Sequence, residues 1–585
     1  MSNLGNFVWS IADQLRGVYK PHQYGDVILP MTILRRLDCV LAATRDKVWE
    51  IAAAEPREEL RNVKIRRATG LNFYNTSPWD FGRLTGDPDG LAANLTDYIA
   101  GFSKNIDVFD RFRFENQIAM MAEKNRLLIV AQAFSEVNLH PKLVSNAEMG
   151  DLFEELIRKF AEASNETAGE HFTPRDAIRL MVDLLFAEDN DALQSTQVIR
   201  TVYDPTAGTG GMLSVAEEYL IGSPEKPGLN PDARLRLYGQ EINDQSYAIC
   251  KSDMIVKGQD ATNIRLGDTL SDDLFAGTTF DYCLSNPPYG VDWKASQPKV
   301  KAEVQRDGER SRFPGGLPPI SDGQMLFLQH LATKMRPVHE GGGRAAIVLN
   351  GSPLFTGGAE SGPSQIRRWL LEHDLVDAIV ALPTNMFYNT GIATYVWILD
   401  NTKHADRIGK IQLIDGTSFF TKMRRNLGAK NREVSAQDRA TILKLYDDFA
   451  ETEHSRIFTT DTFGYWTVTV ERPLVDESGK VIRDRKGSAK PDTKHRDTEN
   501  VPFTYGGNSR GADARDAVVK EYLEAEVLPH VPDAWVDESK TKTGYEIPFT
   551  RQFYRYVPPR PLEEIDADLN KIIGEIMALL REVES

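Results

Sequence analysis

Apolar residues recur three and four positions apart along the first part of the chain, with polar residues between them. That spacing lies on one face of an α-helix, so residues 1–165 are predicted to form a helical N-terminal domain. Ser145 and Glu148 have the spacing of a capping box before the last of these runs. The runs are Phe7, Val8, Ile11, Leu15 and Val18, then Ile33, Leu34, Leu37, Val40 and Leu41, and then Met149, Leu152, Phe153, Leu156, Ile157 and Phe160.

After residue 165 the pattern changes to short apolar runs of strand length that alternate with helical runs. This alternation favours an α/β domain with a Rossmann-like sheet, which we place at residues 166–432. The strand-like runs cover residues 198–203, 235–240, 263–266, 280–285, 344–349, 376–382 and 395–400.

The composition shifts again after residue 432. Residues 433–545 are predicted to be a mixed insertion or extension, in which the polar run 483–496 indicates a mobile hairpin or insertion. Residues 546–585 are predicted to be a helical partner-docking segment with a heptad seam. The seam is too short for a stable coiled coil by itself, so it packs either on its own domain or on a partner. It consists of Ile565, Leu569, Ile572, Ile576 and Leu579.

The chain has 585 residues, a formal net charge of −16, 41% hydrophobic residues and 26% charged residues, as globular proteins do. No apolar run approaches the ~20 residues of a membrane span, and no basic-then-apolar leader opens the chain. Its three scattered cysteines suit neither a disulfide framework nor a zinc site. We therefore expect a cytoplasmic protein with no metal and no membrane partner. An acidic chain that acts on DNA needs a local basic surface or a partner, because phosphate neutralisation dominates affinity.

The most informative stretch is Asn286-Pro287-Pro288-Tyr289, directly after the strand-like run 280–285. Its two prolines fix φ and remove two backbone donors, so the loop is stiff and its carbonyls are free to accept. The Asn amide oxygen and a proline carbonyl can accept both hydrogens of an exocyclic amino group while the Tyr ring covers the heterocycle. Open α/β sheets bind ligands at this end of a strand, so the four residues are candidate catalytic residues. Taken alone, the motif could also be a proline-rich turn with a buried Tyr.

Three neighbouring strand ends also carry candidate ligand-binding residues. The run 198–203 leads into the glycine loop 204–211 and a helix, where backbone N–H groups can approach a ligand closely. The loop is neither a Walker A motif nor a full dinucleotide motif, so phosphate is not the obvious ligand. The next two strands end at Glu241, which suits ribose hydroxyls, and at Asp268. Four successive strand ends of this kind are improbable by chance.

A further motif, Glu170-His171-Phe172-Thr173-Pro174-Arg175, stands just before the glycine loop. Thr173 is a natural N-cap and Pro174 a natural first residue of the helix that follows. Capping alone explains this pair of residues.

The series from Glu170 to Tyr289 resembles the modification subunits of type I restriction-modification systems, which are adenine-N6 DNA methyltransferases dependent on S-adenosylmethionine. The resemblance covers roughly residues 1–430 and implies a seven-stranded methyltransferase sheet. It also implies that Tyr289 stacks on a flipped base together with an aromatic residue of the region that contains Phe387 and Tyr388. A core role for either of these two rings stays open. His171 departs from it, because family members often have an aromatic residue there. The cofactor-binding residues that it implies are Glu170, His171, Phe172, Thr173, Pro174, Arg175, Asp204, Thr206, Ala207, Gly208, Gly210, Glu241 and Asp268.

The resemblance also implies partners. These are double-stranded DNA, a DNA-specificity subunit flanked by two copies of this chain and, in some systems, a motor-nuclease subunit. We expect residues 297–319 to be a long loop whose cations, notably Arg310 and Arg312, contact the DNA backbone. A second basic cluster at residues 422–432 would continue that DNA path.

Two alternatives stay open from the residues. An Asn-Pro-Pro-Tyr motif also serves enzymes that methylate cytosine N4 or a protein glutamine. A cofactor-binding assembly scaffold is the second alternative, but it would predict eroded motif residues and they are intact here. A complete restriction enzyme is disfavoured, because the sequence has no Walker A loop and no convincing nuclease motif.

Overall fold

The computed structural model describes the chain in two compact units, Met1–Ile547 and Pro548–Ser585. The described residues are 3–20, 23–146, 148–153, 156, 173–189, 193–195, 198–222, 227–388, 390–507, 514–556 and 561–584. Among them, no helix combines the length and the apolar character that a membrane crossing requires.

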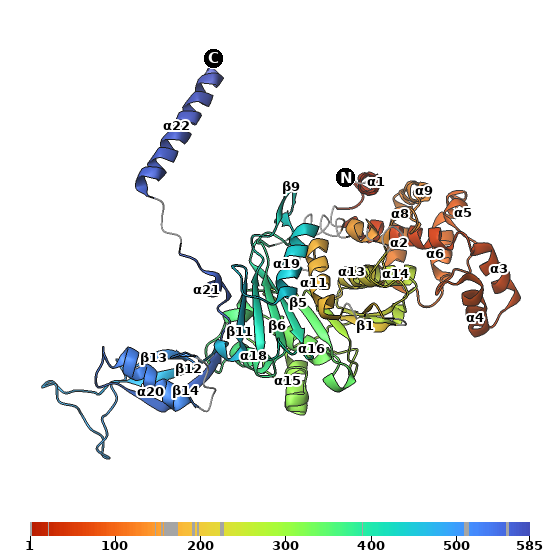
Figure 1. Ribbon diagram of the computed structural model, residues 1–585. Helices are drawn as coiled ribbons and strands as arrows, with labels where there is room; N and C mark the ends of the chain where they lie inside the picture. Colours follow the sequence, from red (N-terminus) through yellow and green to blue (C-terminus); the bar gives the residue numbers. More distant parts are fainter. Residues whose placement is uncertain are drawn as a thin grey trace. The chain divides into compact units, whose positions relative to one another are not determined.

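The N-terminal region is helical, as the apolar spacing predicted (Figure 1). Ser145 and Glu148 form the predicted capping box, since each backbone N–H donates to the other side chain. The apolar faces of most of these helices share one core, which also includes Ile249 and Ile255 of the α/β region. Helices α3 and α4 instead pack in a small separate cluster, where Val48 and Ile65 meet Tyr74. The helices are α1 (Asn3–Leu15), α2 (Gly25–Leu41), α3 (Arg45–Ala54), α4 (Glu58–Thr69), α5 (Phe81–Thr85), α6 (Leu91–Ala100), α7 (Val108–Arg111), α8 (Phe114–Glu123) and α9 (Leu127–Glu136).

A nine-stranded sheet forms the centre of the first unit, in the order β11-β8-β6-β7-β5-β4-β1-β2-β3. Strand β7 runs antiparallel to β5 and β6, and β11 runs antiparallel to β8, while the other pairs are parallel. The strands are β1 (Ile199–Asp204), β2 (Arg234–Glu241), β3 (Ile264–Leu266), β4 (Tyr282–Ser285), β5 (Arg344–Asn350), β6 (Val376–Ala381), β7 (Thr394–Asp400), β8 (Lys410–Asp415) and β11 (Ser455–Thr459).

The seven predicted strands are all present, and the sheet has two more. Strand β8 adds parallel to β6, and β11 closes the edge antiparallel to β8. The sheet thus extends to Thr459, past the boundary predicted at residue 432. The two added strands were missed because polar residues interrupt the apolar residues of both.

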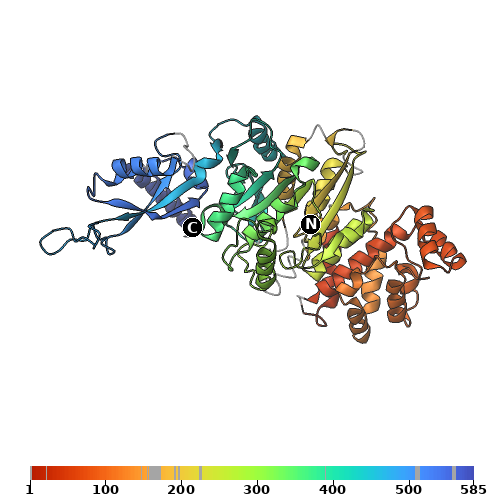
Figure 2. The ribbon, with the colours of Figure 1, turned by 90° about the horizontal axis from the view of Figure 1, so that it is seen from below.

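Helices cover both faces of the sheet (Figure 1). On one face α11 (Arg175–Phe186) packs against α13 (Gly211–Leu220) and α19 (Ala436–Asp448). On the other, α16 (Gln324–Lys334) packs against α18 (Gly362–Glu372) and strands β4 and β5. Helix α14 (Asp244–Val256) contacts β2, β3 and the N-terminal helices, and so joins the helical region to the sheet. Figure 2 shows the helical region beside β1–β3 and the later strands beyond them.

A second, three-stranded antiparallel sheet follows, in the order β13-β12-β14. It consists of β12 (Gly464–Glu471), β13 (Asp497–Pro502) and β14 (Trp535–Tyr545), with α20 (Arg515–Tyr522) beside it. It is anchored by Arg367, a fully buried residue of α18 whose guanidinium donates to the Tyr545 carbonyl at 2.6 Å.

The polar run predicted as a mobile hairpin belongs to an exposed arm, residues 472–496, between β12 and β13. Asp476, Asp484 and Asp492 begin three tight turns eight residues apart, and each carboxylate accepts the N–H two residues further on. Gly479 and Gly487 supply positive φ values of 79° and 84° in the first two turns. The arm therefore contains a repeated turn, one every eight residues. The prediction missed this repeat because it considered only the charged composition of the run.

In the second unit, α21 (Phe549–Phe553) precedes α22 (Leu562–Glu584). Helix α22 contains the predicted seam, and Ile565, Leu569, Ile572 and Ile576 are between 38% and 52% exposed. Leu579 belongs to α22, but its side chain lies outside the described residues.

A buried ionic cluster at the start of β5 ties α19 to the sheet. Arg344 donates to Asp400 at 3.0 Å and to the Tyr446 hydroxyl at 2.8 Å, and that hydroxyl donates to Asp377. All four side chains are buried. The pKa of Arg344 is raised, because its charged partners outweigh the desolvation that lowers it.

Replacing Arg344 with Met should lower the free energy of unfolding by about 3–5 kcal/mol, because it leaves Asp400 buried without its cation. The matched control is Arg368→Met, which breaks an ion pair with Glu372 whose two side chains are 42% and 43% exposed. That loss should be below about 1 kcal/mol. Denaturant midpoints of the two variants check this, and equal midpoints would contradict the structural role of the cluster.

Candidate functional site

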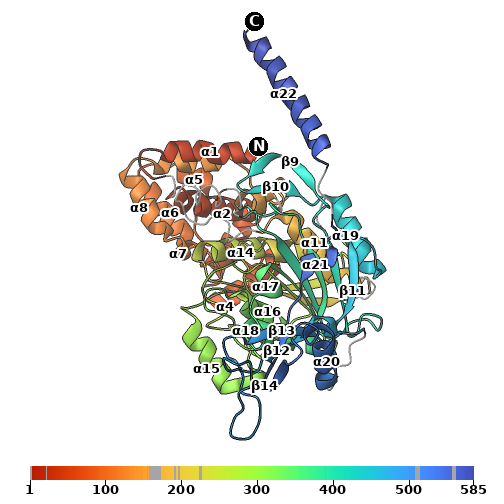
Figure 3. The same cartoon turned by 90° about the vertical axis from the view of Figure 1, so that its left-hand side faces the viewer.

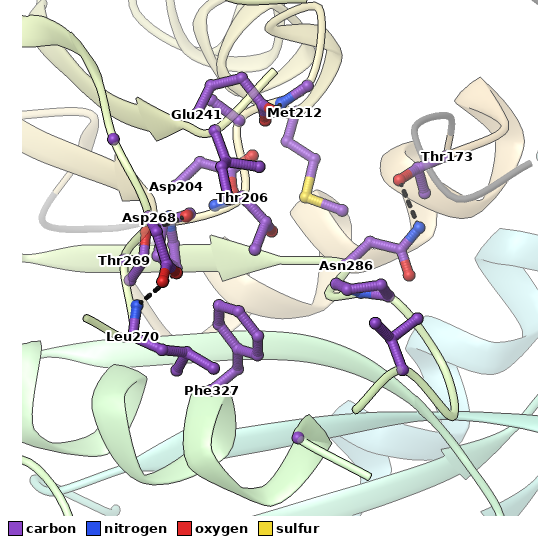
Figure 4. A pocket seen from close by; sticks show the side chains of 18 of the residues that line it. Thr173, Asp204, Thr206, Met212, Glu241, Asp268, Thr269, Leu270, Asn286 and Phe327 are labelled. Atoms are coloured by element: carbon purple, nitrogen blue, oxygen red, sulfur yellow. Dashed lines mark hydrogen bonds between the residues drawn. The ribbon is translucent and has the colours of Figure 1, made fainter. Parts of the chain in front are cut away.

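A pocket of about 330 Å³ lies where the four strands β4, β1, β2 and β3 end side by side. It is lined by residues from the ends of all four strands, by the start of α11 and by Phe327 of α16. Figure 4 shows Asn286 and Thr173 on one side of it, Asp204 and Asp268 on the other, and Phe327 between them. The four predicted strand ends therefore meet in one cavity of ligand-binding size.

The glycine loop after β1 lines the pocket. Its first turn is held by Asp204, whose Oδ1 accepts from the Thr206 N–H at 2.9 Å. Gly208 and Gly210 have positive φ values of 53° and 85°. A Cβ on Gly210 would stand 2.9 Å from Cys250 Sγ, so a side chain fits neither the backbone nor the space there.

Two carboxylates line the pocket at the ends of β2 and β3. Glu241 is 5% exposed and accepts from the N–H groups of Gly208 and Asn243, both at 2.8 Å. Asp268 accepts from the Leu270 N–H at 3.0 Å. Because each carboxylate oxygen has two lone pairs, these contacts orient the groups and leave acceptor capacity toward the pocket.

Asp268 also accepts from the Ser296 hydroxyl at 2.6 Å. Ser296 stands immediately before α15 (Gln297–Asp307), so this bond ties the end of β3 to that helix. The contact joins residues 28 positions apart, and no local sequence signal marked it.

The loop after β4 has one defined amide orientation. Asn286 Nδ2 donates to Thr173 Oγ1 at 2.8 Å, and the Tyr289 hydroxyl donates to Asn286 Oδ1. The ring of Phe387 packs edge-on against Tyr289, with centroids 6.1 Å apart. Phe387 is 2% exposed, and burial raises the pKa of Tyr289 well above its ordinary value. Asn286 thus lines one side of the pocket, with the phenol hydroxyl of Tyr289 bonded to its amide oxygen.

Thr173 does not cap the helix as predicted, although it lines the pocket. Helix α11 begins at Arg175 with Pro174 in the N-cap position, and no side chain caps it. The Thr173 hydroxyl instead accepts from Asn286 Nδ2, across 113 residues of sequence. The N-cap prediction was wrong because that long-range partner was not visible from local capping rules.

Some of the predicted site residues line the pocket and others do not. Those that line the pocket are Thr173, Asp204, Thr206, Ala207, Gly208, Glu241, Asp268, Asn286 and Pro288. Pro174, Arg175, Gly210, Pro287 and Tyr289 do not line it, and Arg175 pairs with Asp151 instead. Glu170, His171 and Phe172 lie outside the described residues.

Several lining residues were not predicted, among them Met212, Ile242, Leu270, Trp293 and Phe327. They give the pocket an apolar lining beside Glu241, Asp268 and Asn286. Ile242 is 65% exposed and directly follows Glu241, so its position at a strand end could have identified it. Phe327 comes from a helix with no motif of its own.

The predicted loop 297–319 begins with the helix α15 instead. Arg312 does not face outward as expected. Its guanidinium pairs with Glu303 at 2.6 Å and donates to the carbonyls of Thr269 and Leu270 at 2.6 and 2.9 Å. Arg312 therefore supports the wall next to Asp268, and its contacts contradict a role in binding the DNA backbone. Arg310 is exposed, and its DNA contact stays a prediction.

Asp204 is 1% exposed, and burial raises its pKa to about 7. Between its ordinary pKa near 3.8 and that value, the folded protein holds a proton that the unfolded chain has lost. This contribution to stability is therefore present at low pH and is lost as the pH rises through 7.

Replacing Asp204 with Asn should remove this pH dependence while keeping an acceptor for the Thr206 N–H. Relative to the wild type, the variant should gain up to roughly 4 kcal/mol in unfolding free energy between pH 4 and pH 8. Denaturant midpoints across that range measure the difference. Parallel pH profiles of the two proteins would show that Asp204 does not titrate as inferred.

Comparison with known proteins identifies the family of this chain. Residues 144–471 match the family model described as N-6 DNA Methylase, and residues 4–134 match the HsdM N-terminal domain. The type I restriction enzyme MjaIX methylase subunit of Methanocaldococcus jannaschii is 26% identical over 439 residues, which is 72% of this chain and 73% of that protein. The MpnII methylase subunit of Mycoplasma pneumoniae is 29% identical over 75% of this chain and 70% of that one.

Solved structures share the fold. A type I restriction-modification methyltransferase subunit from Streptococcus thermophilus aligns with a TM-score of 0.59 and 23% identity, over 78% of this chain and 95% of that one. A modification subunit of a putative type I restriction enzyme from Vibrio vulnificus aligns with a TM-score of 0.53 and 18% identity, over 83% and 97%.

The N-6 DNA methylase model covers more than half of the chain and spans all nine strands and the whole pocket. The chain therefore belongs to the N-6 DNA methylase family, the enzymes that transfer a methyl group from S-adenosylmethionine to adenine N6 in DNA.

Proposed function

We propose that this chain is the modification subunit of a type I restriction-modification complex, and that Asn286, Pro287 and Tyr289 present a flipped adenine to the methyl donor. The observation that carries the assignment of residues is the hydrogen-bonded amide of Asn286, held at the rim of the same pocket as Glu241 and Asp268.

The pocket residues fit S-adenosylmethionine. Glu241 and Asp268 are oriented acceptors, which suit the ribose hydroxyls and the adenine amino group of the cofactor. Ile242, Leu270 and Phe327 provide apolar surface for its heterocycle. Gly208 and Gly210 keep side chains out of the turn. When bound, the cofactor supplies an electrophilic methyl group on a sulfonium.

The residues after β4 would activate the acceptor nitrogen. The N6 lone pair of adenine is delocalised into the ring, so the nitrogen is a weak nucleophile. If Asn286 Oδ1 and the Pro287 carbonyl accept its two hydrogens, electron density returns to nitrogen. Thr173 supports this role, because its bond to Asn286 Nδ2 directs Oδ1 away from α11. Holding N6 in one position also lowers the barrier through orientation.

The target adenine must leave the duplex, which costs a few kcal/mol. Stacking on an aromatic ring contributes ~1–3 kcal/mol per base in single-strand binders and offsets part of that cost. We assign the stacking face to Tyr289. Phe387 is almost fully buried and packs against the edge of Tyr289, so we assign it the support of that ring.

Charge supports the expectation of partners. A net charge of −16 opposes tight binding of the chain alone to DNA. We propose that two copies flank one DNA-specificity subunit, with a motor-nuclease subunit joining in restriction, and that α22 docks on the partner. The half-exposed seam of α22 supports this proposal.

Two substitutions should separate cofactor binding from catalysis. Glu241→Ala removes charged hydrogen bonds to the ribose worth about 1.5–3 kcal/mol each, so affinity for S-adenosylmethionine should fall more than tenfold. Asn286→Ala should leave that affinity nearly unchanged and abolish methylation, because its partner is the substrate amino group. Calorimetry and transfer of labelled methyl to DNA measure the two effects, and each variant is the control for the other.

Two substitutions of Tyr289 test whether its ring stacks on the target base. Tyr289→Ala should be as inactive as Asn286→Ala, whereas Tyr289→Phe should keep part of the activity because the ring face is retained. If the Phe variant is as inactive as the Ala variant, the stacking role is wrong.

Replacing Leu569 and Ile576 with Asp should release the specificity subunit, because it places two charges in an apolar seam, and should spare cofactor binding. Co-purification and calorimetry measure both effects. The control is Ala567→Asp with Asn570→Asp, which adds the same charge to the other face of α22. Equal loss of the partner in both double variants would contradict docking through the seam.

A further inference from the structure

Strands β9 (Thr421–Leu427) and β10 (Lys430–Glu433) pair with each other and with no strand of either larger sheet. We call residues 421–433 the cationic ribbon, since they contain five Lys and Arg residues and one acid in a chain of net charge −16. In Figures 1 and 3 β9 stands clear of the nine-stranded sheet. Most of its side chains are exposed.

The ribbon is attached to the loop that carries Phe387. The Ala429 N–H donates to the Tyr388 carbonyl at 2.8 Å, and the Asn431 N–H donates to the Asn385 carbonyl at 3.1 Å. Strand β10 therefore lies along residues 385–388 and leaves β9 as the outer strand.

A buried cation fixes this attachment. Lys430 is 4% exposed, and its Nζ donates to both carboxylate oxygens of Asp176 and to the Met386 carbonyl at 3.0 Å. Asp176 also accepts from the Val434 N–H at 2.9 Å. The start of α11, residues 385–388 and the ribbon are thus joined at one point. The ammonium group of Lys430 is therefore occupied by contacts within the protein.

Arg432 is also occupied by the protein itself. Its guanidinium donates to Thr384 Oγ1 at 3.0 Å and lies 4.2 Å from the centroid of the Phe420 ring. Three cations of the ribbon remain, and all are on β9.

These three, Lys422, Arg424 and Arg425, are exposed and have no ion pair or side-chain hydrogen bond within the part of the chain that the structure describes. Successive residues of a strand point to opposite faces, so Arg424 and Arg425 serve the two faces of β9. A stable fold gains nothing from holding three like charges together, whereas a polyanion would be bound by them.

Their position identifies the polyanion. The same loop that carries the ribbon presents Phe387 to Tyr289, with ring centroids 6.1 Å apart. The exposed cations are therefore attached next to the ring assigned to the flipped base. The ribbon thus extends from the loop that supports this ring, and the phosphates beside a base bound at the ring are the polyanion nearest to that loop.

We propose that β9 binds the phosphodiester backbone of the DNA strand beside the target base, through Lys422, Arg424 and Arg425. This rests on the proposed function, because it takes DNA as the substrate. Strand β9 would give the acidic chain a local phosphate contact beside the loop of Phe387. Part of the affinity for DNA would then come from this subunit itself.

The test is the salt dependence of DNA binding by the full-length protein carrying Arg424→Gln and Arg425→Gln. Gln keeps a polar side chain and removes the charge, and both sites are exposed, so calorimetry with S-adenosylmethionine should show unchanged cofactor binding. Each lost phosphate contact reduces the slope of log K against log salt by about 0.9, so the double variant should lose about 1.8. Fluorescence anisotropy of a labelled duplex across a series of KCl concentrations measures the slope.

The exposed arm 472–496 provides a matched control. It contains eight Lys and Arg residues against four acids, and Arg485 and Lys486 are exposed without ion pairs in the described structure. Arg485→Gln with Lys486→Gln changes the net charge equally and should leave the slope within error of the wild type. An equal fall in both double variants, or no fall in the first, would overturn the proposal.

Two further outcomes are distinct. If the ribbon variant keeps its DNA slope but loses the specificity subunit in co-purification, the ribbon binds an acidic protein surface and the proposal is wrong. If the slope falls as expected but the wild-type complex transfers no methyl group to DNA, the ribbon assignment stands and the proposed function fails.

Discussion

The hydrogen bond from Asn286 Nδ2 to Thr173 Oγ1 is the interaction on which the account of the site depends. A primary amide has a donor end and an acceptor end, and only the acceptor end can activate an amino group. Because Thr173 takes up the donor end, Oδ1 is left for Tyr289 and for the substrate. The bond also joins the start of α11 to the end of β4. The same short segment therefore positions the amide and begins the helix that carries Asp176, which holds the ribbon.

Charges inside the protein and charges on its surface have different roles. Arg312 and Lys430 both belong to basic stretches of sequence, yet Arg312 is partly buried, Lys430 is buried, and both bind carboxylates and carbonyls. Arg312 braces the wall next to Asp268, and Lys430 holds the loop of Phe387. The exposed cations of β9 remain outside these networks. A basic cluster in a sequence is thus a mixture of structural and surface residues, and only contacts separate them.

Much of the site could be predicted because strand ends are local signals. The glycine loop, Glu241, Asp268 and Asn286 each follow a short apolar run, and parallel strands bring such ends to one edge of a sheet. The order β4-β1-β2-β3 then places all four around one pocket. Some predictions failed because they depended on contacts or burial that the local sequence does not show. Thr173 was assigned to a helix cap because its partner lies 113 residues away. Helix α15 was read as a loop because it buries little besides Val300. One edge of the sheet, formed by β8 and β11, was missed because polar residues interrupt the apolar residues of both strands.

The central claim is that this pocket delivers a methyl group to adenine N6. The most direct measurement is mass spectrometry of nucleosides from DNA incubated with the protein and isotope-labelled S-adenosylmethionine, with and without a DNA-specificity subunit. The account predicts labelled N6-methyladenine, formed sequence-specifically only when the second subunit is present. Labelled N4-methylcytosine would keep the role of Asn286 and contradict the target base, and DNA without label in the assembled complex would contradict the claim itself.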